Sequence, residues 1–155
     1  MIHIGIVGAR KYQDRQSVID LINTLPRGAV IITSSCRGVC TWAGEAAKAT
    51  GFEVRLYSPD LTGIQSHADM VERYYRRNRQ LIAACHIVHA FISKEDGLTG
   101  GTRYEVHYAK RLGKEIVLHW EGGKVERIQR QASLFGAPEA DFSAGWMKFF
   151  TEALG

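Results

Sequence analysis

The sequence predicts an α/β fold: a single domain with a doubly wound, mainly parallel, Rossmann-like sheet. Strand-like segments alternate strictly with helical segments, which is typical of βαβ units joined by right-handed crossovers. Strand-like residues 29–33 are almost wholly apolar, as strands buried on both faces of a sheet are. The chain has 155 residues, of which 45% are hydrophobic, and this length and composition suit one domain with its own core.

Five strands are expected, at residues 1–7, 29–33, 52–57, 87–92 and 115–119. The first strand alternates, is rich in β-branched residues and ends at the turn Gly8-Ala9-Arg10. Four helices are expected between the strands, one beginning after Asp14 and the others at residues 39–50, 65–84 and 102–112. Asp14 can cap the first helix, and Gly51 suits the left-handed position that ends the second.

Three loops that follow strands are rich in small residues. Their candidate ligand-binding residues are Gly8, Ala9, Arg10, Ser34, Ser35, Gly38, Gly100, Gly101 and Thr102. Ligands of open parallel sheets bind outside the carboxyl ends of the strands. Small residues let backbone N–H groups approach an anion, and the amino terminus of a helix adds partial positive charge. The sequence therefore predicts a site for a phosphate-bearing ligand at this edge, with no metal ion and no further cofactor.

Thr102 and Glu105 lie one helical turn apart, and their spacing has two interpretations. In the first, Thr102 gives its hydroxyl to a phosphate and Glu105 lies close to the same ligand. In the second, the pair is a Thr-x-x-Glu capping box, which needs no ligand.

Four arginines fall within seven residues of the third expected helix: Arg73, Arg76, Arg77 and Arg79. Arg73, Arg76 and Arg77 share one face of the helix, and the adjacent Asn78 is a further candidate ligand-binding residue. The arginines form either a solvated basic face or part of an anion-binding site. The net charge of +4 favours anionic partners in a general way.

Taken together, these motifs resemble the SLOG superfamily. The residues that carry the resemblance are Gly8-Ala9-Arg10, Gly38-Val39 before an alanine-rich helix, Arg77-Asn78 and Gly101-Thr102-x-x-Glu105. The superfamily includes the Lonely Guy phosphoribohydrolases, the Rossmann-like domain of DNA-processing protein A, the molybdenum-cofactor carriers and YspA- and YpsA-type proteins. The resemblance covers roughly residues 4–119. Residues 1–120 are therefore expected to be a SLOG-type nucleotide-binding domain, and residues 121–155 a C-terminal extension with one more helix near residues 144–154.

The resemblance implies a nucleotide or nucleotide-derived ligand at the edge of the sheet, and three functions are considered. The first is a sensor or carrier that binds this ligand without turnover. The second is a nucleotide N-glycosidase in which Glu105 and Arg77, which match the Lonely Guy catalytic pair, cleave nucleoside 5′-monophosphates. The third is an accessory role in DNA processing. Cys40 and His86 stand where the Lonely Guy enzymes commonly have aspartates, which favours binding over Lonely Guy-type catalysis.

Cysteines and histidines add few further sites. Cys36 or Cys40 is either a reactive thiol at a helix amino terminus or a small buried side chain. His86 and His89 should point to opposite faces of one strand, which argues against a shared metal.

The partners and location expected are those of a cytoplasmic protein. No apolar run of eighteen residues could span a membrane, and the first residues lack the pattern of a signal peptide. The resemblance leaves a homodimer open. In the extension, the pentapeptide Gln131-Ala132-Ser133-Leu134-Phe135 resembles the peptides that dock on the bacterial sliding clamp. The apolar side chains of Leu134 and Phe135 could equally cover an edge of the sheet.

Overall fold

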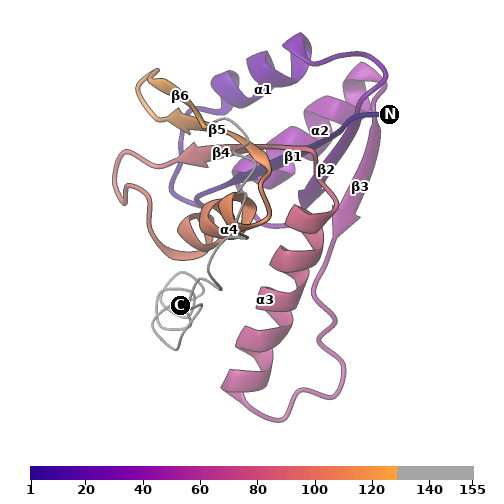
Figure 1. Ribbon diagram of the computed structural model, residues 1–155, viewed down its shortest axis with the longest axis vertical. Coiled ribbons are helices and arrows are strands. Elements are labelled where there is room, and N and C mark those ends of the chain that lie inside the picture. The colour runs from indigo at the N-terminus through magenta and orange to yellow at the C-terminus, as the bar shows by residue number, and fades with distance from the viewer. Residues whose placement is uncertain (129–155) are drawn as a thin grey trace.

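The computed structural model describes residues 1–128, and it has the doubly wound α/β architecture that the sequence predicts (Figure 1). The strands are β1 (His3–Gly8), β2 (Val30–Ser34), β3 (Glu53–Tyr57), β4 (Ile87–Ile92), β5 (Glu115–Trp120) and β6 (Val125–Ile128). The helices are α1 (Arg15–Thr24), α2 (Val39–Thr50), α3 (His67–Ala83) and α4 (Gly100–Arg111). The helix expected near residues 144–154 and the pentapeptide at residues 131–135 lie outside the described residues.

The six strands form one sheet in the order β3-β2-β1-β4-β5-β6. Strands β1 to β5 pair in parallel, as expected from their alternation with helices. Strand β6 was not expected: it pairs antiparallel with β5, with Val125 opposite His119. The turn between them is made by Gly122 and Gly123, both at positive φ, and the Trp120 N–H donates to the Lys124 carbonyl at 2.8 Å.

Helices cover both faces of the sheet, and each face has its own apolar core (Figure 1). On one face, α1 and α2 pack Val18 and Ala43 against strand residues such as Ile6. On the other face, α3 and α4 pack Leu81 and Val106 against β4 and β5. Burying one such aliphatic side chain contributes roughly 1.5–3 kcal/mol to folding, so the two cores hold the loops at the sheet edge in fixed positions.

The helix ends confirm part of the expected capping and correct the rest. The Ser17 N–H donates to Asp14 at the start of α1, and Gly51 ends α2 in the left-handed conformation. The capping box at Thr102 and Glu105 is wrong. The extended residue before α4 is Thr99, so the helix begins at Gly100 and Thr102 lies inside its first turn. Within residues 1–128, no helix is both long and apolar enough to cross a bilayer.

Candidate functional site

The order of the strands fixes where a ligand can approach the sheet. The chain runs outward from β1 through β2 to β3 and then returns to place β4 and β5 on the other side of β1. In sheets of this kind, the direction of winding reverses between β1 and β4, and ligands bind outside the carboxyl ends of the strands at that point. The ends that meet there are those of β1, β2 and β4, at Gly8, Ser34 and Ile92.

The loops after β1 and β2 are in direct contact. A Cβ atom on Gly8 would lie 2.8 Å from the side chain of Val39, at the start of α2. Gly38 has a φ of +84°, and a Cβ atom there would lie 3.5 Å from the carbonyl oxygen of Arg10. Gly8 therefore permits a close approach of the two loops, and Gly38 supplies the positive φ at their contact. Ser34 is buried and accepts a hydrogen bond from the Cys36 N–H at 3.3 Å.

The loop after β4 lies beside the loop after β1. The Ala9 N–H donates to the carbonyl of Phe91 at 3.1 Å. Lys11 reaches across to Glu95 and Asp96, at 3.3 and 3.6 Å. These exposed ion pairs contribute little to stability, but they fix the two loops as neighbours. Farther along the chain from the loop after β4, helix α4 begins with Gly100 and Gly101, and the next residue, Thr102, is buried. In the loop after β2, Ser35 is exposed.

Arg77 connects α3 with the ends of two strands. Its side chain is 5% exposed, so the solvated basic face considered above does not apply to it. Its Nε donates to the side-chain Oδ1 of Asn78 at 2.7 Å, and its Nη1 donates to the backbone carbonyl of Tyr57 at 3.5 Å. Its Nη2 lies 3.6 Å from Cys36 Sγ, in the loop after β2. The guanidinium is therefore held at the candidate edge in one orientation.

Glu105 lies in the second turn of α4 and is 9% exposed. Burial raises the pKa of its carboxyl group to about 7, and the nearby charge of Arg77 partly opposes this rise. A buried carboxyl group with a pKa near neutrality can either donate or accept a proton at physiological pH.

The four helices differ in how their first N–H groups are satisfied. Asp14 and Ser66 accept hydrogen bonds from the first turns of α1 and α3. Gly38 and Thr99, which precede α2 and α4, make no side-chain cap hydrogen bond. A helix amino terminus without such a cap presents backbone donors and partial positive charge to an anion.

The structure decides between the two interpretations of Cys40, and it shows that His86 and His89 differ in burial. Burial raises the pKa of the Cys40 thiol, so the reactive-thiol interpretation is wrong for Cys40. For Cys36 it stays a prediction. His86 is exposed and accepts a hydrogen bond from the His3 N–H, whereas His89 is buried. Within residues 1–128, no three metal-binding side chains gather into one cluster.

Two features of this region were not found from the sequence. The Glu121 carboxylate accepts hydrogen bonds from the N–H groups of Gln13 at 2.7 Å and Lys94 at 2.9 Å, which ties the loops after β1, β4 and β5 together. His89 Nδ1 lies 2.8 Å from His119 Nε2, and burial lowers the pKa of both rings, to about 3 and about 4. The only signal for Glu121 is its place directly after a strand at the same edge.

The fold is shared with proteins that process DNA. The chain is similar to DNA processing protein A from Helicobacter pylori, which binds single-stranded DNA, with a TM-score of 0.60 and 19% identity over 76% of this chain. It is similar to the same protein from Streptococcus pneumoniae, with a TM-score of 0.58 and 19% identity over 76% of this chain. The chain spans 64% and 50% of those two structures. No protein-family model and no curated protein sequence matches the chain. The likeness therefore establishes the Rossmann-like fold that these proteins share.

Proposed function

We propose that the protein binds a nucleotide or nucleotide-derived ligand by its phosphate, at the carboxyl edge of β1, β2 and β4, as a sensor or carrier. One observation carries the proposal: the two helices that begin beside this edge without a side-chain cap, α2 and α4, are those preceded by the small-residue loops. In this proposal, backbone N–H groups at Ser35, Gly38, Gly100, Gly101 and Thr102 hold the phosphate oxygens.

Charged side chains support the same ligand. Arg10 and Arg37 are exposed on the two loops that contact each other, so both can reach a phosphate at the edge. The Arg77 guanidinium already contacts Asn78, Tyr57 and Cys36. Its main role in this proposal is therefore to position the loop at Cys36, and not to contact the ligand. Arginine suits phosphate because its donors form a fixed planar fork.

Single-stranded DNA is a second source of the same phosphate chemistry. The shared fold with a protein that binds single-stranded DNA favours it, as does the exposed Arg76 on α3. Strands of DNA are held by several phosphates at once, and their binding weakens steeply with salt. A mononucleotide fills one phosphate site, so its binding should depend much less on salt.

Turnover is the third candidate, and the environment of Glu105 favours it. A carboxyl group with a pKa of about 7 next to Arg77 can stabilise an oxocarbenium-like sugar while the base departs. Release of free base from nucleoside 5′-monophosphates, lost in Glu105→Gln, would establish the N-glycosidase. No release from any of the monophosphates leaves the binding function as proposed and excludes the enzyme.

Calorimetric titration with a panel of nucleoside 5′-monophosphates and with single-stranded DNA tests the binding proposal. Arg10→Ala should weaken binding about tenfold to a hundredfold, because a hydrogen bond from a charged donor contributes roughly 1.5–3 kcal/mol. Arg27→Ala is the matched control: Arg27 is also exposed but lies before β2, where it donates to the carbonyl of Thr50. Equal effects of the two substitutions, or no binding of any of these ligands, would contradict the proposal.

A further inference from the structure

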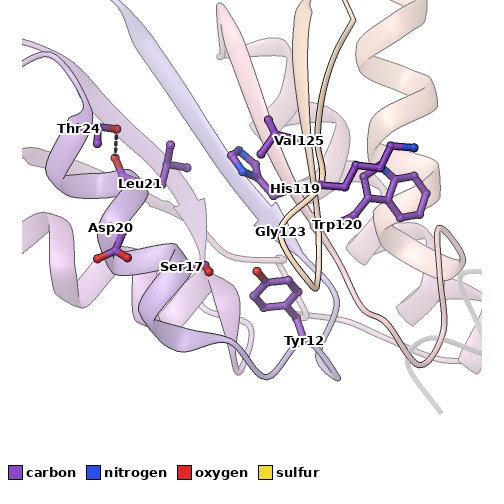
Figure 2. Close-up of a pocket in the computed structure, with 10 residues that line it drawn as sticks. Tyr12, Ser17, Asp20, Leu21, Thr24, His119, Trp120, Gly123 and Val125 are labelled. Atoms are coloured by element: carbon purple, nitrogen blue, oxygen red, sulfur yellow. Dashed lines mark hydrogen bonds between the residues drawn. The ribbon is translucent and has the colours of Figure 1, made fainter.

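A cavity of about 320 Å³ lies between α1 and the hairpin of β5 and β6, outside the phosphate edge described above (Figure 2). Tyr12, Ser17, Asp20 and Leu21 line it from the side of α1, and His119 and Val125 line it from the hairpin. None of the residues proposed to hold phosphate lines it. Its volume falls at the small end of the roughly 300–1,000 Å³ that ligand sites occupy.

The walls of this cavity are held in place by contacts that do not involve a ligand. The His119 ring stacks on Phe91, with centroids 4.5 Å apart and planes 10° apart, and His89 fixes its Nε2. Tyr12 packs edge-on against the same Phe91 ring at 5.3 Å and is 3% exposed. Glu121 joins the loop that carries Tyr12 to the end of β5. The cavity is therefore preformed.

The hydroxyl groups of Ser17 and Thr24 in the cavity already donate their protons to the protein. The Thr24 hydroxyl donates to the Leu21 carbonyl at 2.7 Å, as the dashed line in Figure 2 marks, and the Ser17 hydroxyl donates to Asp14. Tyr12 also makes a side-chain hydrogen bond with Ser17, so of these two hydroxyl oxygens it is that of Thr24 that is left to accept a hydrogen bond from a ligand. Asp20 adds a carboxylate, one oxygen of which is bound by Gln16 at 2.8 Å.

The one cation in the lining is directed elsewhere. Lys124 lies 5.8 Å above the ring of Trp120 and pairs with Glu126 at 3.7 Å. His119 is neutral near pH 7, because burial lowers its pKa to about 4. Asp20 is thus the charged group that is available to a ligand, so the polar lining suits a partner that donates hydrogen bonds. The apolar side chains of Leu21 and Val125 suit a flat ring between them.

We propose that this cavity binds a flat heterocycle with an exocyclic amino group, as in the bases adenine and cytosine, with the amino group directed to Asp20. The choice of a nucleobase among flat heterocycles rests on the proposed function. The two sites are linked because Tyr12 of the cavity and Arg10 of the phosphate edge belong to one loop, in which the Tyr12 N–H donates to the Ala9 carbonyl at 3.2 Å. The cavity itself is a second site, with its own lining and its own chemistry.

Two matched pairs of nucleosides test the proposal, because they carry no phosphate and differ chiefly at the amino group. Adenosine is compared with inosine, and cytidine with uridine, by calorimetric titration of the full chain. We expect the amino-bearing member of each pair to bind about tenfold more tightly, as the loss of one hydrogen bond to a charged acceptor predicts. Asp20→Asn should remove most of that preference, and Asn23→Ala, an exposed substitution on the same helix, should keep it.

A second variant tests the place of binding. Leu21→Trp fills the cavity, so it should abolish nucleoside binding while leaving the binding of ribose 5-phosphate at the sheet edge unchanged. Failure of ribose 5-phosphate to bind the wild-type protein counts against the phosphate site alone. Equal affinity for adenosine and inosine, no nucleoside binding, or nucleoside binding that survives Leu21→Trp would overturn the proposal for the cavity.

Discussion

Glu105 is a candidate site residue whose environment differs strongly from that of its free side chain. Its pKa is about 7 in the folded protein against an ordinary value of 4.5, so the native state retains a proton that the unfolded state releases between those pH values. Stability linked to this group is therefore fully present below pH 4.5 and falls as the pH rises to 7. Glutamine keeps the shape of the side chain and removes the titration.

Glu105→Gln is therefore expected to become more stable relative to the wild type as the pH rises. The free energy of unfolding of Glu105→Gln minus that of the wild type should increase by about 3 kcal/mol between pH 4.5 and pH 8, from roughly 1.4 kcal/mol per unit of pKa shift. Urea denaturation of both proteins at several pH values measures it. Parallel pH profiles of the two proteins would show that the carboxyl group titrates normally.

Gly8 is a second residue whose role is set by geometry alone. A Cβ atom there would meet the Val39 side chain at 2.8 Å, whereas one on Gly28 would meet nothing within 4 Å. We expect Gly8→Ala to cost roughly 1–3 kcal/mol of stability through overpacking, and Gly28→Ala to be neutral or slightly stabilising. Thermal denaturation of the two variants compares them, and similar melting temperatures would contradict the close approach of the loops.

At the scale of elements, the helices differ in whether a side chain caps their first turn. This difference separates α1, whose start has a structural role, from α4, whose start is a candidate binding site. Asp14 caps α1 through its side chain, whereas the side chain of Thr99 makes no such hydrogen bond to α4. Asp14→Ala should therefore destabilise the protein by about 1 kcal/mol, and Thr99→Ala by much less. Chemical denaturation gives both values. A larger loss in Thr99→Ala would mean that α4 is capped after all and offers fewer donors to a phosphate.

The sequence predicted the first five strands and the four helices because their periodicity and their glycine ends are local signals. It did not predict β6, because residues 125–128 are only half-apolar and gain their place by pairing with β5. The start of α4 was placed two residues late, since a threonine before a glutamate three positions later imitates a cap. Local patterns locate elements well, but an edge strand depends on its neighbour.

At the scale of the whole molecule, the residues that join distant loops are the hardest to predict. Arg77 was singled out from the sequence, yet its bonds to Tyr57 and Cys36 come from segments 20 and 41 residues away. The partners of Glu121 and of the pair His89 and His119 had no local signal, because they are brought near only by the order of the strands. The candidate edge could therefore be predicted, whereas the contacts that hold it could not.

The central claim is that loops distant in sequence present their backbone donors to one phosphate. A titration of the ¹⁵N-labelled protein with adenosine 5′-monophosphate, followed by NMR, tests it most directly. We predict that the amide signals of residues 8–10, 34–38 and 100–102 move together and fit one dissociation constant. Signals that move in only one of these loops, or that leave all three unchanged while the nucleotide binds, would contradict the claim.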